Sequence, residues 1–353
     1  MDRVAVLAGL GAGLPSTPVT NSEIAVRLGI EPDWIETRTG IRRRYVVAPG
    51  ESTGDLAVSA GRRALASAGT DTVDAVVLAT STPDRLCPAT APRVADILGL
   101  GTVAAFDVAA VCSGFIYALA TGSGLIAMGA ADTVLVIGAD TFSTIVDPAD
   151  RATSAIFGDG AGAAVLRAGA AGERGAVLAL DLGSDGSRGD LIEVRGGGSR
   201  QRSTGLPAKE EDQFLVMQGQ AVFAQAVQRM SASAAQAAAR CGWSLDDVDW
   251  FVLHQANARI ITAVARQLRL PQERFLSNID RVGNTAAASI PLALADGVLT
   301  GRLRPGQRVV LTSFGGGLTW GSFALSWPRL TVGAPQSGAG PAGTSVDHPG
   351  SIE

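Results

Sequence analysis

Residues 104–119 read AAFDVAAVCSGFIYAL, and two hydrophobic patterns meet there at one cysteine. Residues 103–110 form a short, mostly apolar run, which is typical of an interior strand. From Ser113 onward, small and apolar residues favour a core helix. The sulfur of Cys112 would lie near unpaired backbone N–H groups and the positive end of the helix dipole, which predicts a lowered thiol pKa and a nucleophile. Most free cysteines are instead small buried hydrophobes, so both interpretations stay open here.

The composition limits the class of protein. A length of 353 residues predicts about two domains, and 46% hydrophobic residues are ample for large cores. No apolar run is long enough to cross a membrane, and the N-terminus lacks the pattern of a signal peptide. A net charge of −4 argues against bulk binding of nucleic acid. Three cysteines (Cys87, Cys112 and Cys241) make no disulfide framework, so we expect a reducing, cytoplasmic compartment and a structural Cys241.

Only one histidine is a candidate for catalysis in the folded part of the chain. The two histidines are His254 and His348. His348 lies in a Gly-, Pro- and Ser-rich segment without periodicity, which we expect to be disordered. Residues 183–211 are also polar and Gly-rich, and we interpret them as a surface excursion. We therefore expect a first half over residues 1–170, a second half over 171–329 and a disordered tail over 330–353.

Strand and helix patterns alternate along both halves, as in an α/β fold. We expect strands over residues 3–8, 73–80, 103–110, 133–138, 250–254, 308–312 and 323–327, and helices over 21–28, 53–68, 93–98, 217–240, 256–268 and 284–299. Residues 9–13 predict a turn, and residues 151–166 a Gly-rich turn that leads into a strand. Residues 33–45 form either a solvated loop anchored by one aromatic or a loop whose Trp34 and Arg38 contact a nucleotide.

An internal repeat relates the two halves. Residues 71–78 (DTVDAVVL) match residues 246–253 (DDVDWFVL) at an offset of 175, and the strand at Val134 matches the strand at Val309 at the same offset. The repeat predicts two duplicated α/β halves whose loops converge on a pseudo-twofold axis. At this offset Cys112 corresponds to Ala287, and His254 corresponds to Ala79. Cys112, His254 and Asn284 then lie at strand-to-helix junctions that face one another.

At these three junctions the chain resembles the β-ketoacyl-acyl-carrier-protein synthase III family of the thiolase fold. The resemblance covers about residues 3–328 and rests on several motifs in the family order. They are Trp34 with Arg38-Thr-Gly-Ile41, Ala110-Val-Cys-Ser-Gly114, Gly158-Asp-Gly-Ala-Gly162, Leu253-His-Gln-Ala-Asn257, Val282-Gly-Asn-Thr285 and Phe314-Gly-Gly-Gly317. The resemblance implies two βαβαβ-type halves in a layered α/β/α/β/α core, and a homodimer. It also implies an enzyme that starts fatty-acid or aromatic-polyketide chains.

The resemblance implies a role for each site residue. Cys112 would take an acyl group from acyl-CoA, the backbone N–H groups of Cys112 and Gly316 would form the oxyanion hole, and His254 and Asn284 would stabilise the enolate of malonyl-acyl carrier protein after decarboxylation. The residues implied to contact CoA are Trp34, Arg38, Thr39, Arg151, Phe223, Asn257 and Arg259. Those implied to line the acyl pocket are Cys87, Phe142 and Phe314. Arg259, Arg266 and Arg269 would form a basic face for the acidic carrier protein, unless they are an ordinary solvated face.

Two departures from the family pattern bear on specificity. Ala224 stands where the family often has a lysine near the docking face, so docking would be weaker or use other charges. Cys87 stands where a bulkier residue from the dimer partner often closes the acyl pocket, which predicts room for primers beyond acetyl, unless Cys87 only packs. We expect no metal, and acyl-CoA is a substrate rather than a cofactor.

Three other functions remain open from the sequence. The first is a same-fold acyltransferase to an oxygen or nitrogen acceptor, which would not need His254 and Asn284. The second is a non-catalytic partner subunit, which would be expected to lose Cys112. The third is a Cys/His hydrolase, which the duplicated halves and the CoA-type loop disfavour.

Overall fold

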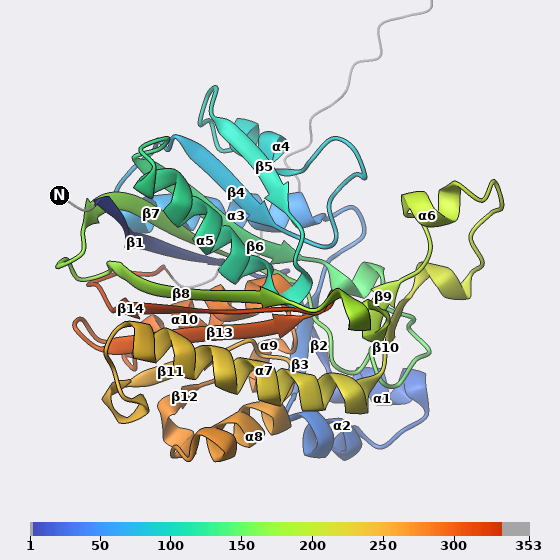
Figure 1. The fold of residues 1–353 in the computed structure, drawn as a ribbon. Coiled ribbons are helices and arrows are strands. Elements are labelled where there is room, and N and C mark those ends of the chain that lie inside the picture. The colour runs from blue at the N-terminus through green and yellow to red at the C-terminus, as the bar shows by residue number, and fades with distance from the viewer. Residues whose placement is uncertain (1–2, 334–353) are drawn as a thin grey trace, which may run out of the picture.

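Two five-stranded sheets with the same strand order form the framework of the protein (Figure 1). The structure is a computed structural model and describes residues 3–333. The first sheet contains, in order, β1 (Arg3–Gly13), β7 (Gly160–Ala170), β6 (Thr133–Asp140), β4 (Ala75–Ala79) and β5 (Ala104–Val108). The second contains β8 (Val177–Ser184), β14 (Thr319–Ser326), β13 (Arg308–Gly315), β11 (Trp250–Leu253) and β12 (Phe275–Leu276). The matching order confirms the predicted duplication.

Helices cover both sheets and fill the space between them (Figure 1). The outer face of the first sheet packs on α3 (Thr53–Ala68) and α4 (Ala91–Ile97). The outer face of the second packs on α7 (Gly219–Arg240) and α8 (Ala258–Leu268). Between the sheets lie α5 (Gly114–Ala127) and α10 (Ser289–Leu299), whose apolar residues join strands of both halves in one core. This arrangement is the expected α/β/α/β/α core.

The offset of 175 residues holds through the centre of both halves. β6 starts at Thr133 and β13 at Arg308, and the 3-10 turns η1 (Val111–Ser113) and η7 (Ala286–Ala288) precede the two central helices. Val111 and Ala286 occupy the same place in these turns and have φ angles of 47° and 45°. A left-handed backbone is unfavourable for residues with a Cβ. Both halves therefore hold the same strained turn in front of a buried helix.

Three of the expected elements are different in the structure. Residues 9–13 continue β1 instead of turning, because α3 lies so close that a Cβ at Gly11 would be 2.1 Å from the carbonyl oxygen of Ala60. The expected interior strand at 103–110 is β5, a half-exposed edge strand of the first sheet. The expected loop at 33–45 contains α2 (Pro32–Thr39) and β3 (Arg43–Val46), and β3 pairs with β2 (Thr17–Thr20).

Other expectations agree closely. The predicted helices at 21–28 and 53–68 are α1 (Asn21–Leu28) and α3, and capping boxes at Thr20 and Ser52 start them. The Gly-rich turn does approach another backbone, since a Cβ at Gly158 would be 2.8 Å from the carbonyl oxygen of Val282. The remaining helices are α6 (Ser199–Arg202) and α9 (Ile279–Val282). Further 3-10 turns are η2 (Phe142–Thr144), η3 (Gly186–Leu191), η4 (Glu211–Gln213), η5 (Leu245–Asp247) and η6 (Gln272–Arg274).

The expected surface excursion and tail need correction. The excursion is partly an arm that projects from the body and carries α6 (Figure 1), but its base is a hairpin of β9 (Ile192–Val194) and β10 (Leu215–Met217) with half-buried residues. At the start of the expected tail, Leu330 and Val332 pack against the core, so residues 330–333 are part of the fold. Residues 334–353, with His348, lie outside the described residues.

Candidate active site

A cavity of about 40 Å³ lies where the two halves meet and brings Cys112, His254 and Asn284 together. These side chains come from the turn before α5, from the end of β11 and from the segment after α9. The rest of the cavity wall consists of Val111, Phe142, Phe157, Ile192, Met217, Val222, Ala226, Met230, Ala256, Ile260, Phe314 and Gly315. A nucleophile and two polar side chains therefore meet in an otherwise apolar cavity.

Cys112 occupies the predicted junction, but its electrostatics differ from the prediction. The residue is only 8% exposed. Burial raises the pKa of the Cys112 thiol above its ordinary value, the nearby Asp140 carboxylate raises this pKa further, and the residue's own backbone N–H lowers it. The expected lowering of the thiol pKa is therefore wrong for the unliganded protein, because desolvation outweighs the N–H groups of the turn. Burial therefore favours the protonated thiol.

The two halves treat one equivalent backbone N–H in opposite ways. In the second half, the N–H of Ala287 donates to Oδ2 of Asp140 at 2.9 Å. At the offset of 175, Ala287 corresponds to Cys112 and Asp140 corresponds to Gly315. The backbone N–H of Cys112 has no oxygen acceptor within residues 3–333. Glycine at position 315 therefore leaves open the N–H that a carboxylate occupies in the other half.

The open N–H suits an oxyanion hole, because such sites need donors aimed at developing negative charge. Gly315 lines the cavity, and a Cβ there would lie 2.8 Å from the backbone nitrogen of Cys112. Gly316, the predicted second donor, follows in the turn between β13 and β14. Its role stays a prediction.

His254 is buried and neutral. Its side chain follows β11, is 2% exposed and has Nδ1 2.6 Å from Oγ of Ser289, the first residue of α10. Burial lowers the pKa of His254 to about 3. A neutral imidazole has one N–H, which can donate a hydrogen bond without adding a fixed positive charge.

Asn284 is held with its amide nitrogen free. Its backbone N–H donates to the carbonyl of Ile156 at 3.0 Å, and its carbonyl accepts from the N–H of Gly158 at 2.9 Å. Its side-chain Oδ1 accepts from the N–H of Ala286 at 3.0 Å. Because the oxygen is engaged by a donor, Nδ2 is left to donate. The site thus combines a thiol with two neutral hydrogen-bond donors.

The residues expected to contact CoA gather where α2 meets α8. The guanidinium of Arg38 lies 4.8 Å from the ring centroid of Trp34. Asn257 caps α8 by accepting from the N–H of Arg259 at 2.8 Å, and Arg259 donates to the carbonyl of Thr37 in α2 at 3.1 Å. Since Ala256 and Ile260 line the cavity, this junction borders the cavity.

The hydroxyl of Thr39 is hydrogen-bonded within its own segment. Its side chain is buried, and its hydroxyl donates to the carbonyl of Ile35 at 2.6 Å and accepts from the N–H of Ile41 at 3.1 Å. These hydrogen bonds lie at the end of α2. Thr39 thus shapes the segment that carries Trp34 and Arg38, and its contact with CoA stays a prediction.

The other residues expected to contact CoA or the carrier protein are exposed. Arg151 is exposed on the turn before β7, and Phe223 on α7 is 38% exposed beside Val222 of the cavity wall. Arg266 and Arg269 are exposed at the end of α8, and neither makes an ion pair within the described part of the chain. This leaves their charges available to a partner.

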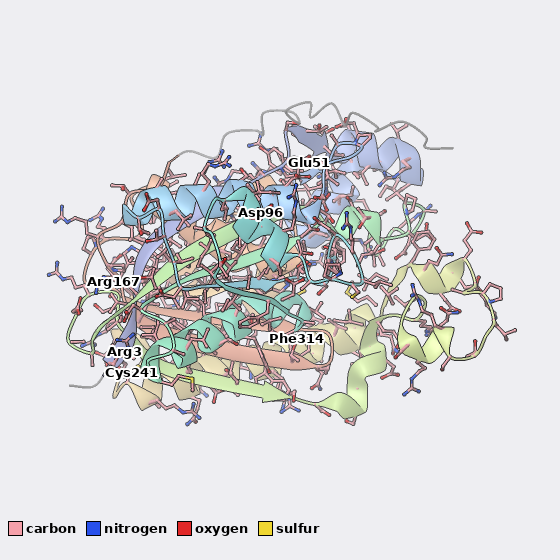
Figure 2. All side chains as sticks on the ribbon, turned by 90° about the horizontal axis from the view of Figure 1, so that it is seen from above. Arg3, Glu51, Asp96, Arg167, Cys241 and Phe314 are labelled. Atoms are coloured by element: carbon pink, nitrogen blue, oxygen red, sulfur yellow. The ribbon has the colours of Figure 1, made fainter. Side chains whose placement is uncertain are left out.

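Two of the three expected acyl-pocket residues line the cavity. Phe142 stacks on Phe157 with ring centroids 4.8 Å apart, and Phe314 lies in the same wall. Cys87 is exposed and does not line the cavity within this chain. Cys241 follows directly after α7 and lies at the end of the molecule away from the α6 arm (Figure 2).

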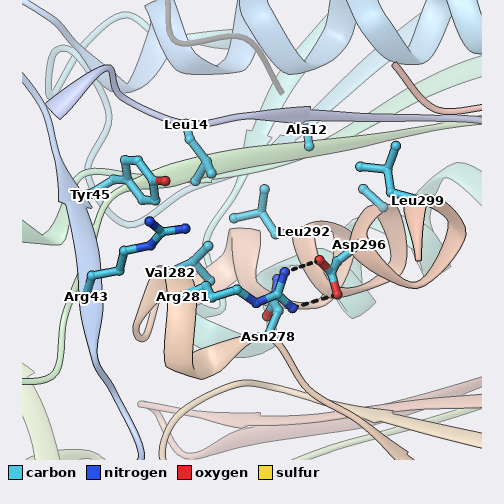
Figure 3. A pocket seen from close by; sticks show the side chains of 11 residues that line it. Ala12, Leu14, Arg43, Tyr45, Asn278, Arg281, Val282, Leu292, Asp296 and Leu299 are labelled. Carbon is cyan, nitrogen blue, oxygen red and sulfur yellow. Dashed lines mark hydrogen bonds and ion pairs between the residues drawn. The ribbon is translucent and has the colours of Figure 1, made fainter. Parts of the chain in front are cut away.

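A second cavity, of about 140 Å³, lies behind α9 and has no cysteine or histidine in its wall (Figure 3). Its walls mix leucine, alanine and valine side chains with polar ones, and Arg281 and Asp296 form a two-bond ion pair there at 2.6 and 2.9 Å. Although this cavity is larger, the reactive groups lie in the smaller one, and we place the chemistry there.

Within residues 3–333, no His, Cys, Asp and Glu side chains cluster in a way that could hold a metal ion. None of the helices in this range has the length and hydropathy to cross a membrane.

Comparisons with known proteins agree with this geometry. The family models for 3-oxoacyl-[acyl-carrier-protein] synthase III and for its C-terminal part match residues 106–186 and 238–327. The β-ketoacyl-[acyl-carrier-protein] synthase III 5 of Streptomyces coelicolor is 59% identical over 332 residues, which cover 94% of this chain and 100% of the relative. The chain belongs to the β-ketoacyl-[acyl-carrier-protein] synthase III family. The corresponding synthase of Pseudomonas aeruginosa is 54% identical over 94% of this chain and 98% of its own length.

Solved structures of the family support the expected thiolase-like architecture. The crystal structure of 3-oxoacyl-(acyl carrier protein) synthase III from Pseudomonas aeruginosa PAO1 matches with a TM-score of 0.87 and 53% identity, over 93% of this chain and 99% of the other. The priming β-ketosynthase of the R1128 polyketide pathway matches with a TM-score of 0.85 and 33% identity, over 93% and 97% of the two chains.

Sequence reasoning missed Gly315, Ser289 and Asp140. The offset of 175 pairs Gly315 with Asp140 and Ser289 with Gly114, so the repeat carried a signal for all three. Ile192 was missed because it lies in the segment 183–211, which was interpreted as a surface excursion. Met217 was missed because it was assigned to the start of the helix over 217–240, whereas it pairs with Ile192 in the β9–β10 hairpin beside the cavity.

Proposed function

We propose that this synthase condenses an acyl-CoA primer with malonyl-acyl carrier protein and so starts fatty-acid or aromatic-polyketide chains. The observation that carries the proposal is the shared cavity of Cys112, His254 and Asn284, in which one thiol faces two neutral donors. Acyl transfer alone needs a nucleophile and an oxyanion hole. The two further donors have a purpose when an enolate forms.

In the first step, the Cys112 sulfur attacks the thioester carbonyl of acyl-CoA. The carbonyl oxygen becomes an oxyanion at the open N–H of Cys112, the C–S bond to CoA breaks, and the thiol proton ends on CoA. The product is a thioester on Cys112. Because burial raises the pKa of this thiol, attack and proton loss are coupled instead of starting from a stored thiolate.

In the second step, malonyl-carrier protein loses CO₂, and the electron pair of the broken C–C bond forms an enolate. The amide of Asn284 and the imidazole of His254 donate to the thioester oxygen, whose negative charge grows during this step. Donors that gain strength only as charge develops lower the barrier without tightening substrate binding equally. The enolate carbon attacks the Cys112 thioester, which gives the β-ketoacyl-carrier protein and a Cys112 thiolate that takes up a proton.

The test is a primer competition on the purified protein. It receives equimolar acetyl-, propionyl-, butyryl-, isobutyryl- and hexanoyl-CoA, then malonyl-carrier protein, and intact mass reports the acyl-enzyme and the β-ketoacyl product. Acyl-enzyme with condensation supports the proposal. Acyl-enzyme without condensation would favour the same-fold acyltransferase, and persistent acylation of Cys112→Ala would overturn the assignment of the nucleophile. A preference for longer or branched primers would support the wider pocket expected from Cys87.

We further propose a homodimer. The edge strand β5 has half-exposed Phe106 and Val108, and Leu86 beside Cys87 is 71% exposed. Unpaired edges with apolar side chains favour pairing with another chain. In such a dimer, Cys87 of one protomer could border the cavity of the other protomer. Light scattering that finds only monomer would overturn this. The proposed reaction needs no cofactor, and its thiol chemistry suits a reducing cytoplasm.

A further inference from the structure

We propose that Ser289 is a positioning residue that selects the tautomer of His254, so that Nε2–H is the proton presented to the cavity. This inference rests on the proposed function, in which His254 donates a hydrogen bond to the malonyl thioester. Ser289 itself contacts no substrate. It acts through the imidazole ring at Nδ1.

The hydrogen bonds at Ser289 leave one consistent arrangement. Oγ of Ser289 lies 2.6 Å from Nδ1 of His254 and accepts from the backbone N–H of Gln255 at 3.3 Å. These are the partners of this hydroxyl within residues 3–333. If Nδ1 carried the proton, Oγ would receive two N–H donors, and its own proton would have no acceptor in a residue that is 1% exposed. If the hydroxyl donates to Nδ1, every group is satisfied and the ring proton is on Nε2.

The repeat supplies an independent argument. At the offset of 175, His254 corresponds to Ala79 and Ser289 corresponds to Gly114. A Cβ at Gly114 would lie 2.9 Å from the Cβ of Ala79. The half without the imidazole therefore also lacks the hydroxyl, and it fills the space with closely packed backbone. The serine and the histidine occur together in one half and are both replaced in the other.

The chemistry of the group at Nδ1 also distinguishes His254 from a general base. A carboxylate at Nδ1 would stabilise an imidazolium and favour proton abstraction. Ser289 is neutral, the cavity wall contains no Asp, Glu, Lys or Arg, and burial is what lowers the pKa of His254. The hydroxyl thus fixes the position of the proton without charging the ring.

The two-histidine sequence makes the tautomer directly measurable. Protein with ¹⁵N-labelled histidine gives signals from His254 and His348 alone, and a His348→Gln variant assigns them. In the resting wild-type protein we expect His254 to show a protonated Nε2 and an unprotonated Nδ1. A protonated Nδ1 would overturn the proposal, and this reading needs no variant of Ser289 and no turnover.

Variants then test the consequence for catalysis. We expect Ser289→Ala to lower the condensation rate on the order of 10–100-fold, less than the roughly 10²–10³-fold typical of losing an oxyanion donor outright, and to leave acylation of Cys112 by acyl-CoA nearly unchanged. Its histidine spectrum should show Nδ1–H or a mixture. Ser289→Thr keeps the hydroxyl and should keep the Nε2–H tautomer.

The matched control is Ser123→Ala, which removes a buried hydroxyl from α5 that has no hydrogen-bond partner. Both rates should stay near wild type in this control. An Nε2–H signal that persists in folded Ser289→Ala would overturn the proposal. Wild-type protein that acylates Cys112 but never condenses would instead overturn the proposed function, and the resting tautomer would still decide the role of Ser289.

Discussion

The carboxylate of Asp140 accepts a hydrogen bond from the backbone N–H of Ala287 at 2.9 Å, and in doing so a strand of the first half closes a turn of the second. The same carboxylate also accepts from the N–H of Ser81 at 2.7 Å. The equivalent of Asp140 in the second half is Gly315, where the turn of Cys112 is left with an open N–H. Near-symmetry in the backbone thus becomes asymmetry in chemistry through one pair of positions.

Gly315→Ala should block acyl transfer. Its Cβ would lie 2.8 Å from the backbone nitrogen of Cys112 and 3.0 Å from that of Ser113, so the N–H would move away from the oxyanion or be covered. We expect a loss of roughly 10²–10³ in the rate of Cys112 acylation, as for other losses of an oxyanion donor. Intact mass over time measures the rate. Equal acylation rates in Gly315→Ala and wild type would contradict the prediction.

Asn284→Asp should separate acylation from condensation. The carboxylate can still accept from the N–H of Ala286, which Oδ1 does now at 3.0 Å, so the turn should keep its shape. It replaces the Nδ2 donor by negative charge, which repels an enolate, and we expect condensation to fall by roughly 10²–10³-fold or more. Stopped assays of acyl-enzyme and of β-ketoacyl product give the two rates. Parallel loss of both would mean that Asn284 acts before the condensation step.

Asp140 and His254 should give the stability of the protein two opposed pH dependences. Burial raises the pKa of Asp140 to about 7 from 3.8, so its contribution to stability is lost as pH rises from about 4 through 7. Burial lowers the pKa of His254 to about 3 from 6.5, so its contribution is lost as pH falls from about 6.5 through 3. Between about pH 4 and 6.5 the two effects offset each other.

In Asp140→Asn, the pH dependence of stability that comes from His254 should therefore become visible. The substitution removes one of two opposing slopes, each at most about 1.4 kcal/mol per pH unit. Between pH 4.5 and 6.5, the free energy of unfolding should rise by up to about 2–3 kcal/mol more in the variant than in wild type. Urea unfolding at both pH values measures this difference, which is independent of any constant loss from the missing hydrogen bonds. The same pH dependence in both proteins would contradict the shifted pKa of Asp140.

Reversing Arg266 and Arg269 should weaken the use of the carrier protein. Both side chains are exposed at the end of α8 without ion-pair partners in the described part of the chain. Arg266→Glu with Arg269→Glu should raise the KM for malonyl-carrier protein by about tenfold at low salt, less at high salt, and leave the KM for acyl-CoA unchanged. Arg62→Glu, an exposed reversal on α3, is the control, and an equal effect there would point to net charge instead of docking.

Much of the site could be predicted because it depends on local patterns and on a repeat. The Cys112 junction, the position of His254 at a strand end and the capped helices α1 and α3 all follow from short-range periodicity and capping. The offset of 175 then placed the second half against the first. Site residues drawn from both halves could be expected to converge before any coordinates were known.

The failures have physical causes that no local pattern contains. The predicted lowering of the Cys112 thiol pKa was wrong. Desolvation of the thiol depends on the residues of the second half and of the β9–β10 hairpin that cover it. Residues 9–13 were assigned to a turn because their glycines resemble loop residues, whereas α3 requires them for close packing. The hydrogen bonds of the Thr39 hydroxyl within its own helix end also could not be read from the motif.

The contacts between the two halves also determine how the protein loses activity during storage. The Asn284 segment is joined to the first half by the bonds to Ile156 and Gly158, and Ala287 by the bond to Asp140. Because one apolar cluster spans both halves, separation of the halves unfolds the core. The same event would separate the reactive groups from one another. A stored or heated sample should therefore contain working molecules and unfolded ones, with few that are intact yet idle, and residual activity would serve as a gauge of the folded fraction.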